Sequence, residues 1–174
     1  MKINMKEWLA ELLAAPEKKA MPVLSFPAIQ LMDITVRDLI SDEGAQAKGM
    51  KMIADRVDSL ASVSLMDLSV EAECFGSEIR YADDEVPTVI GSVVADEEGA
   101  EALQIPAIGT GRTQIYIDAI KMAVKEITDR PVFAGIIGPF SLAGRLMDVT
   151  EAMVYCYEEP DMVHTILEKA SLFL

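Results

Sequence analysis

Asp67 is the residue with the clearest chemical potential, because it comes at the end of a predicted buried strand. The strand is expected over residues 61–66, and a short helix follows Asp67. In a barrel of parallel strands, the carboxyl ends of the strands face the active site. A carboxylate there can accept hydrogen bonds from a substrate, or act as a base if desolvation raises its pKa. Asp67 could instead cap the helix that follows, and its position alone leaves both interpretations open.

Three further charged residues could join Asp67 at this rim. Glu71 and Glu73 follow it in the predicted helix, and two carboxylates near one strand end could form an acid–base set. Arg145, which follows a turn at Gly138, could bring a cation to the same place. The alternatives are exposed helix charges for the glutamates and a solvated or ion-paired side chain for Arg145. We predict Asp67 as a catalytic residue, either substrate-binding or a base, and Glu73 and Arg145 as substrate-binding residues.

Metal chemistry has little support in this sequence. His164 is the single histidine, and its nearest potential partners are Glu168, Asp161 and Cys156. A zinc site needs three or four ligands, and the patterns Cys-x-x-Cys, His-x-Cys and His-Glu-x-x-His are missing. We therefore predict no stoichiometric zinc in this chain, and we assign no ligand role to His164, Cys156 or Cys74.

The segment 108–112, Ile-Gly-Thr-Gly-Arg, is a weak candidate for a phosphate-binding loop. It lacks both the G-x-G-x-x-G spacing and the lysine of a P-loop, and an acidic segment precedes it. A plain loop leading into a helix is the favoured interpretation.

The elements that must position these residues alternate between short apolar strands and helices. Strands are predicted at 23–26, 61–66 and 132–137, and the last is continuously apolar, as is typical of a strand buried on both faces. The main helices are predicted at 4–14, 43–58, 113–127 and 140–147, with others beginning near 150 and 160. Segments 79–81 and 89–94 predict a β-hairpin with a long acidic turn. This alternation favours an α/β fold with parallel strands.

Composition bounds the class of protein. The 174 residues suffice for one domain with a sizeable core, and the net charge of -14 disfavours binding to nucleic acid. No apolar run approaches the roughly 20 residues that span a bilayer. Charges at Lys2, Lys6, Glu7 and Glu11 interrupt any signal-peptide core, so we expect a cytoplasmic location. Two cysteines do not make a disulfide framework.

Two segments, taken in their order and spacing, resemble the uroporphyrinogen decarboxylase superfamily. They are residues 66–79, Met-Asp-Leu-Ser-Val-Glu-Ala-Glu-Cys-Phe-Gly-Ser-Glu-Ile, and residues 131–143, Pro-Val-Phe-Ala-Gly-Ile-Ile-Gly-Pro-Phe-Ser-Leu-Ala. That superfamily also includes methylcobamide:coenzyme M methyltransferases and related corrinoid enzymes. The resemblance implies a (β/α)8 TIM barrel of which this chain is the N-terminal part. Asp67 matches the aspartate that, in decarboxylases, accepts hydrogen bonds from the pyrrole N–H groups of the tetrapyrrole.

The resemblance is closer to the methyltransferases than to the decarboxylases. The positions of the decarboxylase Arg-x-x-x-Arg pair hold Pro27 and Leu31, and the tyrosine expected after the Gly-Pro-aromatic motif is replaced by Arg145. Losing paired arginines removes the main complement to a polycarboxylate substrate. The acidic hairpin and the Glu73-x-x-Gly76 pattern resemble the methyltransferase branch, whose chemistry uses zinc to lower the pKa of a thiol that attacks a methyl group on cobalt.

These inferences lead to one expected function and two alternatives. We expect a single domain over residues 1–174, the N-terminal half of a TIM barrel with an inserted β-hairpin, belonging to a corrinoid-dependent methyltransferase and inactive alone. The family's zinc ligands, His-x-Cys and a later cysteine, belong to the second half, and the uncapped apolar end at 172–174 predicts a truncation. The alternatives are a tetrapyrrole carboxy-lyase and a non-catalytic corrinoid-binding or assembly module. Expected partners are a corrinoid protein or tetrapyrrole-type ligand, a second copy, or the missing half.

Overall fold

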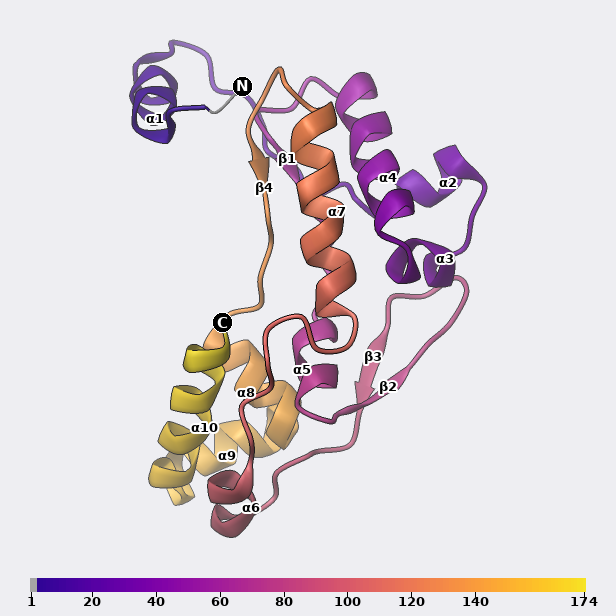
Figure 1. Ribbon diagram of the computed structural model, residues 1–174. Helices are drawn as coiled ribbons and strands as arrows, with labels where there is room; N and C mark the ends of the chain where they lie inside the picture. The colour runs from indigo at the N-terminus through magenta and orange to yellow at the C-terminus, as the bar shows by residue number, and fades with distance from the viewer. Residues whose placement is uncertain (1–2) are drawn as a thin grey trace.

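The computed structural model describes residues 3–174, and Met1 and Lys2 lie outside the described residues (Figure 1). The helices are α1 (Met5–Ala14), α2 (Ala28–Met32), α3 (Val36–Ser41), α4 (Glu43–Arg56), α5 (Val70–Cys74), α6 (Glu97–Ala102), α7 (Thr113–Glu126), α8 (Pro139–Met147), α9 (Val149–Glu158) and α10 (Pro160–Phe173). The strands are β1 (Ser62–Val63), β2 (Glu78–Arg80), β3 (Thr88–Ile90) and β4 (Val132–Phe133). Between residues 3 and 174, no helix combines the length and the apolar character needed to cross a membrane.

A short parallel pair, β1 and β4, forms the centre of the upper part of the molecule. Ser62 pairs with Val132 and Val63 with Phe133, so the expected α/β fold with parallel strands is confirmed. The regular ladder is shorter than the predicted 61–66 and 132–137, because beyond Phe133 the chain hydrogen-bonds to a side chain. The backbone N–H of Gly135 donates to Oγ of Ser64 at 2.7 Å.

The strand predicted at 23–26 is wrong, because this segment has no regular strand structure. Prolines bound it on both sides, and a proline has no N–H to donate to a ladder. Ser25 replaces the ladder, since its hydroxyl donates to the carbonyls of Val63 and Ser64 at 3.1 and 2.8 Å. The segment therefore lies against β1 through one side chain.

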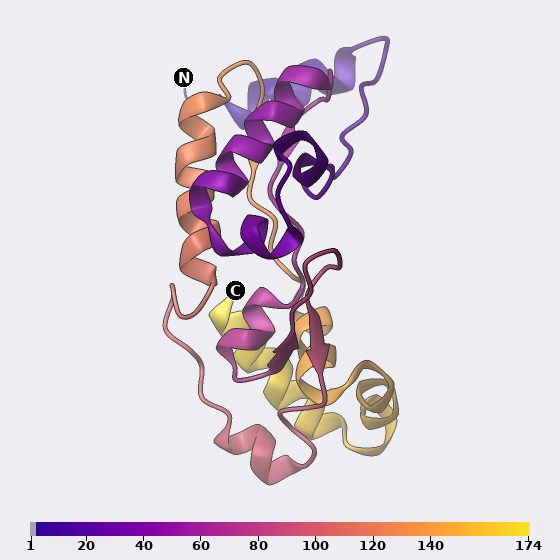
Figure 2. The ribbon, with the colours of Figure 1, turned by 90° about the vertical axis from the view of Figure 1, so that its right-hand side faces the viewer.

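Helices α4 and α7 lie side by side next to β1 and β4 (Figures 1 and 2). Their contact is a small apolar cluster in which alanines allow close approach of the two helix backbones. Its buried members are Ala47, Met50, Ala54, Ala123 and Ile127. Asp42 caps the start of α4 by accepting from the N–H of Ala45, which fixes where this helix begins. This pairing positions α7, whose first turns line the candidate site.

A larger apolar cluster supports helix α5 from below, where α6 and α8–α10 gather (Figure 1). Leu142, Leu146 and Ile166 are fully buried in it, and Ala72 and Phe75 bring α5 and its C-cap into the same cluster. Nζ of Lys169 donates to the carbonyls of Ala100, Glu101 and Leu103, which satisfies the end of α6. The cluster therefore sets the position of α5 and of its glutamates.

Strands β2 and β3 form an antiparallel hairpin, in which Glu78 pairs with Ile90 and Arg80 with Thr88. Its second arm ends earlier than the predicted 89–94. The backbone N–H groups of Val93 and Val94 donate instead to the carbonyl of Leu146 in α8, at 2.7 and 3.0 Å. The hairpin thus continues into a segment held by α8.

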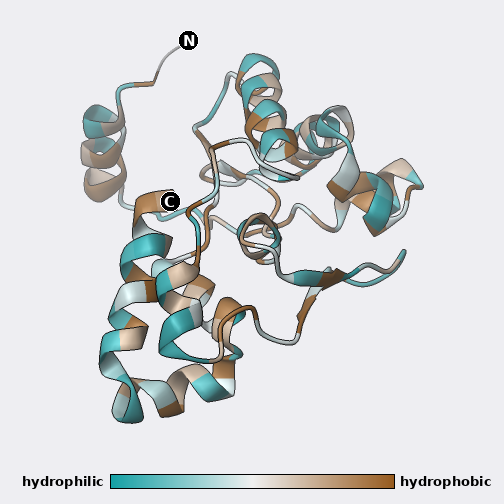
Figure 3. Cartoon of the chain, turned by 60° about the horizontal axis from the view of Figure 1, so that its bottom comes forward, coloured by the Kyte–Doolittle hydropathy of each residue, from teal (hydrophilic) through white to brown (hydrophobic). Residues whose placement is uncertain are grey.

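Helix α1 has no buried residue and carries bands of apolar side chains (Figure 3). Leu9 and Leu13 are 49% and 72% exposed. Trp8 packs edge-on against Phe133 of β4, with ring centroids 5.9 Å apart. This aromatic contact joins α1 to the central strand pair.

Candidate functional site

Asp67 follows the carboxyl end of β1 after residues 64–66, and its side chain is completely buried. Oδ1 accepts hydrogen bonds from the backbone N–H of Ser69 at 3.0 Å and from its hydroxyl at 2.6 Å. Oδ2 accepts from Arg112 at 2.5 Å and from the hydroxyl of Tyr116 at 2.9 Å. Asp67 therefore combines a turn-forming role with an ion pair, and both of its oxygens already have partners.

Arg112 is the centre of this network, and sequence reasoning missed it. It follows a loop in which Gly109 and Gly111 have φ of 85° and 56°, a conformation that favours glycine. Besides the pair with Asp67, its Nε donates to Oε2 of Glu73 at 2.6 Å, and its guanidinium lies 5.1 Å from the ring centre of Tyr81. Burial opposes the charge, but the carboxylate of Asp67 raises the pKa of Arg112, so it stays a cation.

Two tyrosines complete the network as hydrogen-bond donors. Burial and the carboxylate of Asp67 raise the pKa of Tyr116. Burial and a hydrogen bond to Glu73 raise the pKa of Tyr81, whose hydroxyl donates to Oε1 of Glu73 at 2.5 Å. Both phenols therefore keep their protons at neutral pH. The network joins the end of β1, helix α5, the hairpin and the start of α7.

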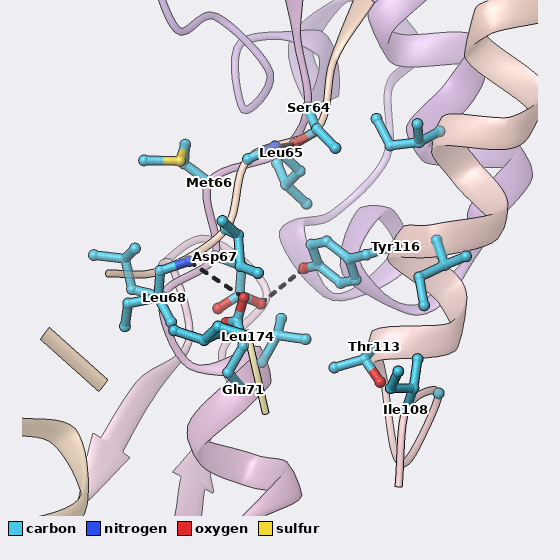
Figure 4. A pocket seen from close by; sticks show the side chains of 18 of the residues that line it. Ser64, Leu65, Met66, Asp67, Leu68, Glu71, Ile108, Thr113, Tyr116 and Leu174 are labelled. Carbon is cyan, nitrogen blue, oxygen red and sulfur yellow. Dashed lines mark hydrogen bonds between the residues drawn. The ribbon is translucent and has the colours of Figure 1, made fainter. Parts of the chain in front are cut away.

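A cavity of about 520 Å³ lies beside this network (Figure 4). This volume is within the range of roughly 300–1,000 Å³ that is usual for small-molecule sites. Most of the wall is apolar, and Figure 4 shows Asp67, Glu71 and Tyr116 together in one part of it. The lining residues include Met66, Leu68, Ile117, Ile120, Ile136 and Phe173. The cavity suits a largely apolar small molecule.

The structure brings together two of the three predicted site residues. Arg112 joins Asp67 to Glu73, and Glu71 lies in the cavity wall. Arg145, in the last turn of α8, does not line the cavity, and it makes no hydrogen bond or ion pair with the described residues. The part of the chain that the structure describes thus gives Arg145 no contact with Asp67.

The residues considered for metal binding lie apart. His164 is exposed on α10 and Cys156 is exposed on α9. Sγ of Cys74 lies 3.0 Å from the carbonyl of Thr110, and burial raises the pKa of this thiol, which keeps it protonated. Among residues 3–174, no group of three or more histidine, cysteine, aspartate or glutamate side chains is arranged to hold a metal ion.

Comparison with protein families identifies this arrangement of elements. The family model described as uroporphyrinogen decarboxylase (URO-D) matches residues 15–174. The chain belongs to the URO-D family. The resemblance predicted from segments 66–79 and 131–143 is therefore confirmed.

Two known proteins are similar to this chain. A methylcobamide:CoM methyltransferase, MtbA, of Methanosarcina acetivorans is 38% identical over 79 residues, which are 44% of this chain and 23% of that protein. The structure of a methyltransferase from Methanosarcina mazei superposes with a TM-score of 0.82 at 21% identity, over 99% of this chain and 53% of that one. The second likeness shows the fold. The chain spans about half the length of this solved relative.

Proposed function

We propose that this chain is the N-terminal half of a TIM barrel, one domain over residues 1–174, in a corrinoid-dependent methyltransferase of the URO-D family. The observation that carries the proposal is the 38% identity with a methylcobamide:CoM methyltransferase, which is joined by the structural likeness to a second methyltransferase. Because the chain spans about half of that structure, the half-barrel is proposed to be inactive alone. In this proposal, β2 and β3 are an insertion into the barrel.

The charges at the cavity favour methyl transfer over the decarboxylation of a tetrapyrrole. A polycarboxylate substrate needs free cations, but Arg112 is already paired with Asp67 and Glu73. Lys121 lines the cavity, yet its ammonium group already pairs with Asp118. Pro27 and Leu31, at the positions of the decarboxylase arginines, supply no charge.

The residues present do not fit zinc, so the proposed zinc ligands lie in the other half of the barrel. No step of methyl transfer is assigned to Cys74, Cys156 or His164. In the proposed enzyme, the apolar cavity would receive the acceptor thiol, and a separate corrinoid protein would present the methyl group. Asp67 and Glu73 would hold the wall of this cavity in place through their ion pairs with Arg112. A substrate-binding role for Arg145 would require contacts with the second half of the barrel.

The coding sequence that follows the Leu174 codon tests this proposal. A reading frame that encodes His-x-Cys and a later cysteine would support the methyltransferase. A segment with tyrosine, serine and histidine but without zinc ligands would support the carboxy-lyase. A stop codon with no second half nearby would favour a non-catalytic assembly or corrinoid-binding module.

The unpaired edges of the strand pair predict self-association of the isolated chain. Within residues 3–174, β1 and β4 pair only with each other, and Ile136, just past β4, is 58% exposed. Such an edge leaves backbone groups open to another chain. We expect multi-angle light scattering at high micromolar concentration to give the mass of a dimer, which a second copy would form most simply.

A matched pair of variants locates the proposed interface. Ile136→Lys should shift the chain towards the monomer, because a charge on the exposed apolar segment that follows β4 opposes its burial against a second copy. Val124→Lys, at a residue on α7 that is 46% exposed, should leave the mass unchanged. A wild-type chain that stays a monodisperse monomer, with no apolar surface accessible to dye, would contradict association.

A further inference from the structure

The two carboxyl groups in the cavity wall, Asp67 and Glu71, differ sharply in how they are satisfied. Asp67 has four hydrogen bonds, divided between its two oxygens. Oε1 of Glu71 accepts one long bond, 3.4 Å from the backbone N–H of Ile137. Oε2 of Glu71 is buried, and no donor among the described residues reaches it. Glu71 is therefore the carboxyl of the cavity wall that has a buried oxygen without a partner in the part of the chain that the structure describes.

An unpartnered buried carboxylate is costly, whereas its neutral form can donate a hydrogen bond. Helix α5 holds Glu71 in place, because the neighbouring Val70 and Ala72 are buried on the same short helix. Arg112 stabilises the carboxylate of Glu71 only a little, because its guanidinium is already shared between Asp67 and Glu73.

We propose that Glu71 is the proton-exchanging residue of this cavity, and that it donates a hydrogen bond to the acceptor group of a neutral, largely apolar ligand. Ligand binding is accompanied by the uptake of one proton: the carboxylate takes a proton from solvent, and the resulting acid keeps this proton while its O–H donates a hydrogen bond to a carbonyl or ether oxygen of the ligand. Asp67, by contrast, positions the wall and does not meet the ligand. This inference concerns the ligand of the same cavity, and it rests on the proposed function only in that respect.

The groups around Glu71 determine whether its pKa is raised or lowered. Burial raises the pKa of Glu71; the backbone N–H groups of Glu71 and Ile137 lower it, the carboxylate of Asp67 raises it, and Arg112 lowers it. From α7, the titratable groups at the cavity are Tyr116, which keeps its proton, and Lys121. Segment 134–137 contributes no ionisable side chain. The net direction favours protonation of Glu71.

The first test is a titration followed by NMR on the full chain. The backbone amide of Ile137 should shift with pH, because it donates to Glu71. We expect its midpoint, and that of the Glu71 carboxyl carbon, above the usual glutamate value of about 4.3. Glu71→Gln should abolish the shift of Ile137. Glu126→Gln, which removes one charge from an exposed site on α7, should leave it unchanged.

The second test uses prodan, a neutral naphthyl ketone whose charge does not change between pH 5 and pH 8. We expect prodan to bind roughly fivefold more tightly at the lower pH, the change that one ordinary hydrogen bond produces. Glu71→Gln, which imitates the protonated acid, should bind equally at both pH values, while Glu126→Gln should behave like the wild type. Amide shifts at residues 134–137 should report the dye in the cavity.

Three results would overturn the proposal. They are a Glu71 midpoint at or below the usual value, a pH dependence of prodan binding that survives in Glu71→Gln, and dye that is not bound in this cavity at the lower pH. None of these measurements involves methyl transfer, so a negative result here would not contradict the proposed function. A failure to transfer methyl groups would likewise not contradict the role of Glu71.

Discussion

Replacement of Arg112 by alanine should lower the free energy of unfolding by about 3–5 kcal/mol, the usual cost of leaving a buried carboxylate without its cation. The side chains of Arg112 and Asp67 are 11% and 0% exposed. The same substitution removes the ion pair with Glu73 and the contact with Tyr81. Urea unfolding followed by circular dichroism measures this difference.

Arg37 offers a matched control for Arg112. It also pairs with an aspartate, Asp83, and also lies over the ring of Tyr81, at 5.8 Å, but its side chain is 54% exposed. Exposed ion pairs contribute about 0–1 kcal/mol, so Arg37→Ala should change stability little. Equal losses for Arg112→Ala and Arg37→Ala would contradict the central role given to Arg112.

Truncation of Leu146 to alanine should cost about 2–5 kcal/mol, because it opens a cavity in the cluster that supports α5. Leu146 is fully buried, and its carbonyl accepts from the N–H groups of Val93 and Val94. The loss should loosen α5 together with α8, which broadens the amide signals of Glu71 and Glu73 in an NMR spectrum. Thermal and urea unfolding give the energy.

Leu172→Ala is the control for the core truncation. Leu172 lies on α10 but is 67% exposed, so its removal should change the free energy of unfolding by less than about 0.5 kcal/mol. If Leu146→Ala were as mild as Leu172→Ala, the cluster around α8 would not be the support of α5 described above.

Much of the fold could be predicted from local pattern. The continuous apolar run at 132–137 and the segment before Asp67 indicated the parallel pair, and periodic apolar residues indicated α4 and α7. The apolar run at 23–26 has the composition of a strand, but the prolines that bound it at 22 and 27 prevent regular pairing. Beyond the regular pairing of β1 and β4, the N–H of Gly135 donates to the hydroxyl of Ser64, a contact that no periodicity predicts.

The candidate site was only partly predictable for a similar reason. The position of Asp67 followed from its place after a strand, but its partner Arg112 is 45 residues away in the sequence. Its only local signal is the Gly-Thr-Gly segment before it, a pattern typical of a loop leading into a helix. That interpretation was correct for the backbone, since α7 begins at Thr113, but it did not include the role of the side chain. Arg145 had an equally good local pattern and has no such partner among the described residues.

A methyl-transfer assay on the completed barrel tests the central claim most directly. The chain would be mixed with the segment encoded after Leu174, supplied with zinc, methylcobalamin and a small thiol, and followed by the change in the cobalamin absorption spectrum. We expect demethylation that requires both halves and the thiol, with one zinc per pair and none held by this chain alone. A completed barrel that leaves methylcobalamin unchanged but decarboxylates a porphyrinogen would contradict the account.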